Sequence, residues 1–321
     1  MNFKRFTGSI LLLLLLLGCG PRNARKAAAP QHRDFPRMEV PAMLPDSPQE
    51  RMAWLTAHFW DAFLRPDTLY ACDSTLVNGV PRDDVEKQLG VFATLLHQLP
   101  LEEGIPAMRS FYARLDAFQQ AHPESNVFPV LVKLTSSYFY DPNSPVRSED
   151  LYRPFAAALA QSPWIPADRR PGYAWEAQMC SLNAVGTPAA DFPFVDSRGR
   201  RRTLYGIRAD VTLLIFGNPD CAACRDLVRT MEEYPELQEH VRNGELCIVD
   251  VYIDEEIDQW KQRIPEYPAS WINGYDPDFR IRTDLLYNVR GIPSIYLLDA
   301  SKTVLMKDAV EEDVLAALVN L

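Results

Sequence analysis

The sequence has no excess of basic residues, no internal repeat and few histidines. It carries 33 Lys and Arg against 43 Asp and Glu, a formal charge of −10, and an acidic chain is not expected to bind nucleic acid. A zinc site needs about four Cys or His ligands, but the sequence contains one CxxC, no second CxxC and no HxxxH. His58 and His97 have no ligand-like partners nearby in sequence, so we expect no metal site and predict that both are satisfied or exposed.

A hydrophobic run long enough to cross a bilayer is also missing. The apolar stretch Ile10–Leu17 follows Lys4 and Arg5 and has the layout of a secretory signal peptide, which we place at residues 1–18. The next residues complete Leu16-Leu17-Gly18-Cys19, which matches the lipobox of bacterial lipoproteins and predicts lipid on Cys19. The alternative is an ordinary signal peptide with a chance cysteine.

A lipidated protein of this kind is exported and faces the periplasm. Gly20 stands where lipoproteins of the inner membrane commonly carry Asp, which favours the outer membrane over the inner. Residues 19–46 contain five prolines and five basic residues and are predicted to form an extended tether between the lipid and the first domain.

Residues 47–182 have the pattern of a mainly helical domain. Ser47-Pro48-Gln49-Glu50 combines a capping box with Pro at the first helical position, and apolar residues then recur at helical spacing until Pro66. Further helices are expected at about 81–99, 102–120, 149–161 and 167–182, whereas the apolar segment 127–140 is ambiguous. An aromatic stripe fits a hydrophobic core better than a binding groove; it comprises Trp54, Phe59, Trp60 and Phe63.

Residues 183–321 alternate short apolar strands with helices. The pattern predicts a hairpin around Asp196–Gly199, buried strands at 211–216 and 245–253, and a second hairpin at 294–299 and 303–307. Helices are expected at 221–240, 255–263 and 311–321. This order implies a sheet that contains parallel strands and is covered on both faces.

Two motifs in this second half carry a family resemblance. Cys221-Ala-Ala-Cys224 directly follows the strand at 211–216, and the segment Tyr287–Ser294 includes Arg-Gly-Ile-Pro-Ser. With the order of strands and helices, they resemble the thioredoxin family, in which the corresponding proline is cis and packs against the active-site cysteines. The hairpin before the strand is similar to membrane-anchored thiol-disulfide oxidoreductases of the TlpA and ResA type.

The resemblance implies an α/β thioredoxin-like domain, with a central mixed sheet flanked by helices, after a mainly helical domain. It covers residues 183–321 alone. The helical part resembles segments of unknown function that precede such domains in Gram-negative lipoproteins.

The dithiol has a chemistry that follows from its place. A cysteine at a helix N-terminus meets free backbone N–H groups, which favour its thiolate. Cys221 would attack a substrate disulfide and Cys224 would resolve the mixed disulfide. The resemblance implies that cis Pro293 keeps Ile292 beside the dithiol to pair with a substrate strand. Protein disulfides and a membrane electron donor or acceptor are the expected partners, and no cofactor is implied.

Two positions depart from thioredoxin. Ile215 replaces the buried Asp that precedes the first cysteine by six residues, and Asp220 replaces the Trp that stands directly before it. As a negative charge and a candidate helix N-cap, Asp220 is expected to disfavour the Cys221 thiolate.

A structural disulfide is disfavoured because the pair lies at a helix start and closes no loop, and a zinc site lacks two further ligands. The main alternative is a thioredoxin-like domain that serves as a non-catalytic scaffold or binding lipoprotein. Cys247 fits a buried strand position. Cys72 and Cys180 are free to pair with each other, but the sequence does not show connectivity.

Overall fold

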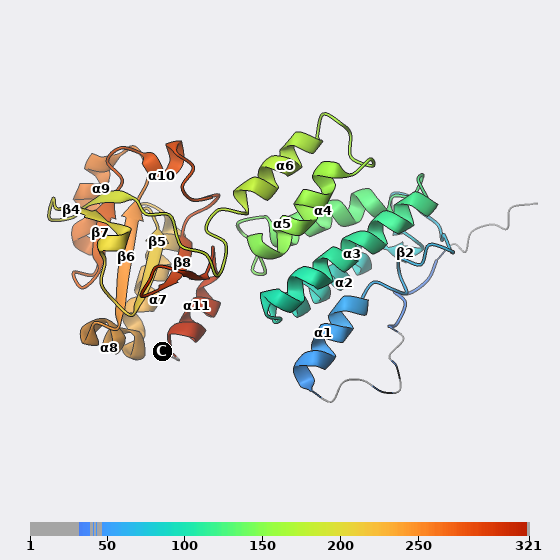
Figure 1. The fold of residues 1–321 in the computed structure, drawn as a ribbon, viewed down its shortest axis with the longest axis horizontal. Coiled ribbons are helices and arrows are strands. Elements are labelled where there is room, and N and C mark those ends of the chain that lie inside the picture. The colour runs from blue at the N-terminus through green and yellow to red at the C-terminus, as the bar shows by residue number, and fades with distance from the viewer. Residues whose placement is uncertain (1–31, 39–40, 42, 44–46, 320–321) are drawn as a thin grey trace, which may run out of the picture.

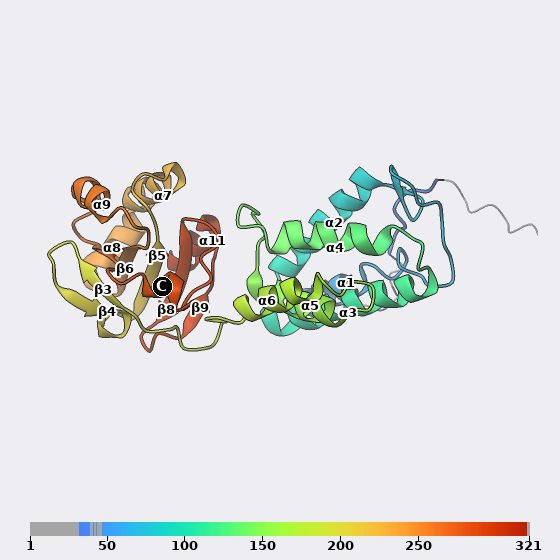
Figure 2. The same ribbon diagram turned by 90° about the horizontal axis from the view of Figure 1, so that it is seen from above.

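The computed structural model describes residues 32–38, 41, 43 and 47–319 (Figure 1). Helices gather in one half of the molecule and a sheet with its own helices forms the other half, as Figures 1 and 2 both show. The predicted signal peptide, the lipidation site Cys19 and most of the tether lie outside the described residues. No helix in the described part of the chain combines the length and apolar character that a membrane crossing requires.

The helical domain is built from six helices and a small hairpin among its described residues. Ser47 begins α1 by accepting a hydrogen bond from the backbone of Glu50, and Ser148 begins α5 in the same way with Leu151. The elements are α1 (Pro48–His58), β1 (Leu76–Val77), β2 (Val80–Pro81), α2 (Arg82–His97), α3 (Leu101–Ala121), α4 (Val127–Phe139), α5 (Glu149–Gln161) and α6 (Arg170–Met179).

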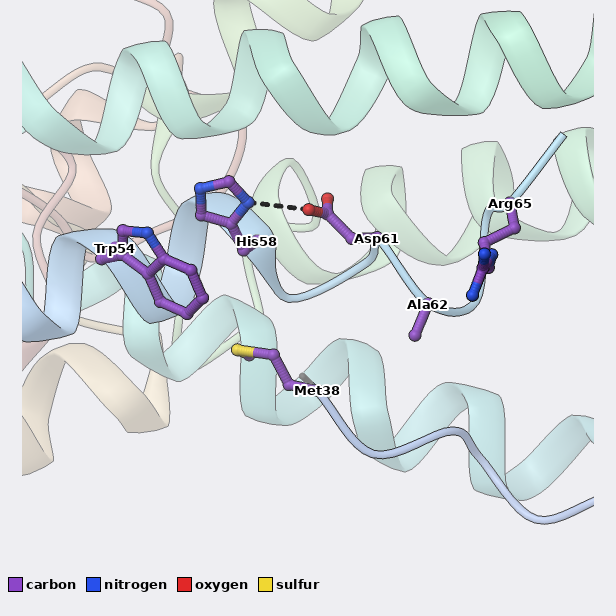
Figure 3. A pocket seen from close by; sticks show the side chains of 6 residues that line it. All are labelled: Met38, Trp54, His58, Asp61, Ala62 and Arg65. Atoms are coloured by element: carbon purple, nitrogen blue, oxygen red, sulfur yellow. Dashed lines mark hydrogen bonds and ion pairs between the residues drawn. The ribbon is translucent and has the colours of Figure 1, made fainter. Parts of the chain in front are cut away.

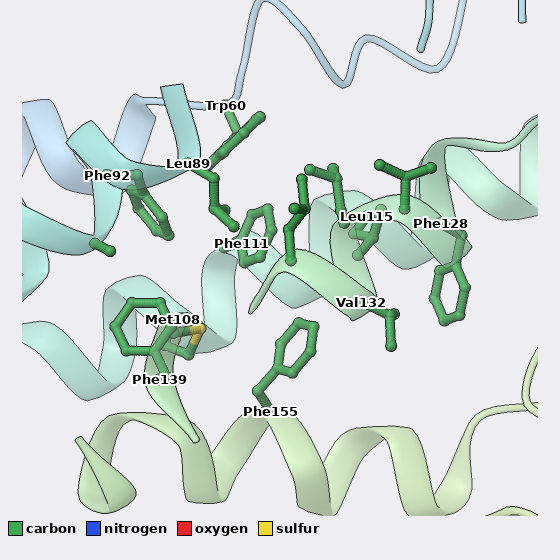
Figure 4. Packing of buried hydrophobic residues seen from close by; sticks show 14 of the residues in the cluster. Trp60, Leu89, Phe92, Met108, Phe111, Leu115, Phe128, Val132, Phe139 and Phe155 are labelled. Atoms are coloured by element: carbon green, nitrogen blue, oxygen red, sulfur yellow. The ribbon is translucent and has the colours of Figure 1, made fainter. Parts of the chain in front are cut away.

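Aromatic rings fill the core of this domain (Figure 4). The ring of Trp60 lies 5.2 Å from that of Phe111, which stacks on Phe155 at 5.9 Å. Trp60 and Phe63 are 1% exposed, so the interpretation of the aromatic stripe as core is confirmed for them. The prediction that the first helix continues to Pro66 is wrong, because it ends at His58 and the following turns let these large rings pack inward.

The prediction of an extended tether up to residue 46 is wrong in part. The backbone N–H of Arg33 donates to the carbonyl of Gly79 at 2.8 Å, and its guanidinium lies 3.7 Å from the centre of the Tyr70 ring. Phe35 stacks on Phe63 at 5.1 Å. Cation–π and aromatic contacts therefore fix this segment to the helical domain.

The second half contains a seven-stranded mixed sheet in the order β4-β3-β7-β6-β5-β8-β9. Strands β5, β6 and β7 run parallel, and the other neighbours pair antiparallel. The strands are β3 (Pro193–Asp196), β4 (Arg201–Thr203), β5 (Val211–Phe216), β6 (Leu246–Tyr252), β7 (Ile272–Tyr275), β8 (Ser294–Asp299) and β9 (Val304–Met306).

Helices cover both faces of this sheet, as the buried strands require. Leu227 of α7 and Val314 of α11 share the core on one face of the sheet, and Tyr287 and Ile281 belong to the core on the other face. The helices are η1 (Leu204–Gly206), α7 (Ala222–Glu233), α8 (Pro235–Asn243), α9 (Ile257–Arg263), η2 (Ile264–Glu266), α10 (Arg280–Thr283) and α11 (Glu311–Leu318).

Two sequence predictions for this half need correction. The single helix expected at 221–240 is divided into α7 and α8, because Pro235 lacks the N–H that would continue the first helix. Strand β7 was not predicted, since its four residues follow directly on a connection that contains Pro265, Pro268 and Trp271.

Candidate functional site

The cysteine pair of the CAAC motif lies at the N-terminus of α7, after the loop that follows β5. All six residues of β5 are buried, so the strand fixes the position at which the following loop begins. Cys221 is the N-cap of α7, and its Sγ accepts a hydrogen bond from the backbone N–H of Cys224 at 3.3 Å. Cys221 is partly exposed and Cys224 is 2% exposed. The first sulfur is therefore open to attack a partner while the second lies beneath it.

The segment before β8 reaches the same point. The Ile292–Pro293 peptide bond is cis, as the resemblance implies, and the Sγ of Cys221 lies 3.8 Å from the carbonyl oxygen of Ile292. Cys221 and Ile292, which are 71 positions apart in the sequence, are therefore in contact. This contact places Ile292 and Pro293 beside the dithiol.

Asp220 does not act as the helix N-cap, because Cys221 takes that role. The carboxylate of Asp220 instead accepts from the Nε of Arg263 at 3.3 Å, and both side chains are about half exposed, at 49% and 47%. The prediction that Asp220 occupies the amides at the helix N-terminus is therefore wrong. The negative charge of Asp220 is partly offset by the nearby guanidinium of Arg263.

Polar contacts hold the loop between β5 and α7. The amide of Asn218 donates to Asp254 at 2.9 Å, and Asn218 accepts from the backbone of Asp220 at 2.9 Å. Arg225, from the first turn of α7, donates to the carbonyl of Pro219 at 2.8 Å. The cysteine pair is thus held from both sides, which limits how far the two sulfurs can be displaced.

A buried carboxylate lies next to the dithiol on the neighbouring strand. Asp250 of β6 pairs in register with Ile215 of β5, the position where thioredoxin has its buried Asp. Its Oδ1 has no hydrogen-bond partner among the described atoms. Gly217 makes room for it, because a Cβ at that glycine would lie 2.8 Å from the Oδ1 of Asp250.

Burial sets the protonation of these groups. It raises the pKa of Asp250 to about 7. Burial also raises the pKa of the Cys224 thiol well above its usual range, with further contributions from the hydrogen bond with Cys221 and from the charge of Asp250. The Tyr267 hydroxyl also lacks a hydrogen-bond partner among the described atoms. Burial raises the pKa of Tyr267, and the charges of Asp250 and of both cysteine sulfurs raise it further.

The sequence analysis did not identify Asp250 or Tyr267 as site residues. A signal for Asp250 was present, since one carboxylate interrupts the apolar strand LCIVDVY. The pairing of that carboxylate with Ile215 depends on strand order, which the residue pattern does not contain.

A buried ion network joins the two domains directly behind the Ile292–Pro293 segment. Glu149, at the start of α5, accepts from the Nε of Arg290 at 2.8 Å and pairs with the Nζ of Lys307 at 2.7 Å; its side chain is 1% exposed. Arg290 also contacts Asp308 at 3.1 Å, and Arg147 pairs with Asp308 at 3.5 Å. The helical domain is thereby tied to the segment that carries the cis proline.

The remaining cysteines lie apart from this site. Among the described cysteines all five are free thiols, so no Cys72–Cys180 disulfide is present. Burial raises the pKa of Cys180 and of Cys247. Cys247 lies in β6, as predicted, where it is partly buried and packs against one of the two cores of the sheet.

The histidines singled out in the sequence are both satisfied. His58 contacts Asp61 at 2.7 Å and stacks on Trp54 at 4.4 Å, in a small pocket of the helical domain (Figure 3). His97 contacts Asp313 of α11 at 2.7 Å across the domain junction. Within the described residues, no group of three or more His, Cys, Asp or Glu side chains is placed to hold a metal ion.

Comparisons with known proteins address both halves of the chain. Residues 20–176 match a family model described as a domain of unknown function, DUF5106. The crystal structure of a thioredoxin-like protein from Bacteroides caccae is 29% identical, with a TM-score of 0.75 over 89% of this chain and 99% of that one. No curated protein matches the chain.

Two further solved structures each match about two fifths of the chain. The C-terminal domain of an uncharacterized protein from Bacteroides fragilis is 38% identical over 42% of this chain and 97% of its own, with a TM-score of 0.41. The thioredoxin domain of a thiol-disulfide oxidoreductase from Bacteroides vulgatus is 21% identical over 43% and 96%, with a TM-score of 0.39. Residues 20–176 are therefore similar to the DUF5106 family, and the second half of the chain has the thioredoxin-like fold.

Proposed function

We propose that this protein is a thiol-disulfide oxidoreductase that acts on protein disulfides through the Cys221–Cys224 dithiol. The observation that carries the proposal is the position of the Cys221 Sγ, which caps α7 and lies 3.8 Å from the carbonyl of Ile292, next to cis Pro293. A partly exposed sulfur at a helix N-terminus above a buried second thiol is the arrangement that disulfide exchange uses.

The reaction proceeds in two exchange steps. The Cys221 thiolate attacks one sulfur of the substrate disulfide, forms a mixed disulfide and releases the other substrate sulfur as a thiolate. Cys224 then loses its proton and attacks the Sγ of Cys221, which forms the Cys221–Cys224 disulfide and releases the second substrate thiolate. The substrate gains two electrons and the dithiol loses two. The same steps run backwards when the protein oxidises its partner.

Asp250 takes the proton from Cys224 in the second step, directly or through a water molecule. Its pKa of about 7 lets it exchange a proton near neutral pH. Burial raises the pKa of Cys224, so the thiol needs an acceptor before it becomes a nucleophile. Asp250 lies on β6 opposite Ile215 and supplies from the adjacent strand the carboxylate that β5 lacks.

Trapping the mixed disulfide tests the assignment of the two cysteines. The reduced Cys224→Ser variant should accumulate a Cys221-linked adduct with a protein disulfide substrate such as oxidised insulin, because the resolving thiol is gone. The Cys221→Ser variant, matched in composition, should not. If neither variant forms an adduct and the wild type exchanges with no disulfide, the domain is a scaffold for binding, which is the alternative function.

We also propose that the protein is exported and held at a membrane by lipid on Cys19, facing the periplasm, with the outer membrane favoured. Leu16-Leu17-Gly18-Cys19 and the apolar run before it support this. A reductant in that compartment needs a membrane electron donor, and an oxidant needs an acceptor. Metabolic labelling with a radioactive fatty acid should mark the wild type and fail to mark Cys19→Ser; equal labelling of both would contradict the anchor.

A further inference from the structure

A pocket of about 290 Å³ lies at the junction of the two domains, beside the dithiol. One wall comes from the segment between α4 and α5, with Pro142, Asn143, Pro145 and Arg147. The opposite wall combines Ala223 of the CAAC motif with Ile292 and Pro293. Figure 2 shows this α4–α5 segment extending toward α11 of the thioredoxin-like domain. Both domains are needed to enclose the pocket.

The wall from the helical domain is firmly attached. Arg147 donates to the carbonyls of Asp308 and Ala309, each at 2.9 Å. Pro142 packs so closely on Gly291 that a Cβ at this glycine would lie 3.0 Å from the Cβ of Pro142. The ion pair of Glu149 with Arg290 lies just behind. The α4–α5 segment is therefore a fixed part of the pocket.

The pocket and the reactive sulfur share Ile292 as a neighbour. Ile292 lines it, and the carbonyl of this residue lies 3.8 Å from the Sγ of Cys221. A polypeptide whose cysteine reaches Cys221 and whose backbone runs along Ile292 would place a neighbouring side chain against the helical wall. The Ile292 residue is partly exposed, so its backbone can take part in such strand-like pairing.

The charged residues that line the pocket determine which side chain of a bound polypeptide fits there. Arg147 and Asp308 offset each other, at 3.5 Å. Glu311 and Glu312 also line the pocket, and within the described residues neither has an ion-pair partner. Asp313, the next residue, is engaged by His97 at 2.7 Å. Two carboxylates therefore face the pocket without a cation, partly offset by the N-terminus of α11.

We propose that the DUF5106 domain forms one wall of the substrate site, and that the site takes an extended cysteine-containing polypeptide with a Lys or Arg close to the cysteine. This rests on the proposed thiol-disulfide exchange, and it gives the helical domain a part in choosing the substrate. Glu311 and Glu312 receive the basic side chain, while Asn143 and Pro142 limit its path.

Two short peptides test the preference. They share one sequence with a central cysteine, carried as a mixed disulfide with glutathione, and differ by Lys or Glu beside it. The full-length reduced protein should reduce the Lys peptide at least about threefold faster than the Glu peptide, and the ratio should fall toward one at about 0.5 M salt. Equal rates at low salt would overturn the basic preference.

Matched variants locate the effect. The double variant Glu311→Gln, Glu312→Gln should lose the preference, whereas Glu232→Gln, Glu233→Gln, which removes the same charge from the far end of α7, should keep it. The second comparison uses the ratio of the rate with a peptide to the rate with glutathione disulfide. Asn143→Trp should lower this ratio at least about fivefold for either peptide, whereas Gln161→Trp, at the exposed end of α5, should leave it unchanged. If Asn143→Trp leaves that ratio unchanged, the helical wall takes no part.

A binding measurement separates this inference from the proposed function. Fluorescent Lys and Glu peptides with serine in place of cysteine are titrated onto Cys221→Ser, Cys224→Ser protein. Tighter binding of the Lys peptide, lost in Glu311→Gln, Glu312→Gln, supports the site even if the wild type exchanges no disulfide. Exchange without any peptide preference in rate or binding keeps the proposed function and overturns this inference.

Discussion

Replacing Glu149 by Gln removes the carboxylate that joins the two domains. The Glu149 side chain is 1% exposed and faces Arg290 and Lys307, which are 12% and 1% exposed. Removing one partner of a buried ion pair costs about 3–5 kcal/mol, because the charge left behind stays desolvated. Gln keeps the shape of the side chain and one acceptor oxygen, so we expect the free energy of unfolding to fall by about 3 kcal/mol. That is a large part of the roughly 5–15 kcal/mol that stabilises a typical protein.

Urea unfolding followed by circular dichroism and tryptophan fluorescence measures this loss. The control is Asp67→Asn, which removes an exposed carboxylate from its pair with Arg65, with side chains 68% and 59% exposed; it should cost under about 0.5 kcal/mol. A loss below about 1 kcal/mol for Glu149→Gln, or one equal to the control, would refute the reasoning that buried charges at the junction hold the domains together.

Three further predictions concern the dithiol. The pKa of Asp250, about 7 in the folded chain, is raised from about 3.9 in the unfolded chain, so the native state binds the extra proton between these values. The free energy of unfolding should therefore fall by up to about 4 kcal/mol as pH rises from about 4 to 7. Urea unfolding at about pH 5 and pH 8 should show this difference in the wild type and not in Asp250→Asn, which should also resolve the mixed disulfide more slowly. An unchanged pH difference in the variant would contradict the assignment. Gly217→Ala should destabilise by about 1–3 kcal/mol, because the new methyl meets the Oδ1 of Asp250, whereas Gly172→Ala, with open space around it, should show no such loss in the same assay. Asp220→Asn should speed alkylation of Cys221 by iodoacetamide at about pH 6.5, but less than about threefold, because Arg263 already offsets the Asp220 charge; a slower rate would show that Asp220 does not disfavour the thiolate.

Local patterns predicted the elements that local forces determine. The helix expected at 149–161 matches α5, since a capping serine and apolar residues at helical spacing specify both ends. The strand VTLLIF and the cysteines directly after it occupy the positions expected from their order. Pro235 ended α7 earlier than the apolar periodicity indicated, although a proline within a helical pattern is itself a signal for a boundary.

The site as a whole depends on contacts that no local pattern contains. Glu149 and Arg290 are 141 residues apart, and each is an ordinary charged residue within its own segment. Asp250 becomes a candidate proton acceptor only because β6 lies beside β5 in a particular register. The sequence therefore predicted the two sulfurs and the Ile-Pro segment, whereas the carboxylate beside them and the helical wall came from the three-dimensional arrangement.

The redox equilibrium of the full-length protein with glutathione is the most direct test of the central claim. The fraction of Cys221–Cys224 disulfide is measured against the ratio of reduced to oxidised glutathione, with Cys221→Ser as the control. A redox-active dithiol predicts a potential between about −270 and −120 mV, the range of catalytic thioredoxin-like proteins. A pair that stays oxidised below about −300 mV, or one that never equilibrates with glutathione, would contradict the account.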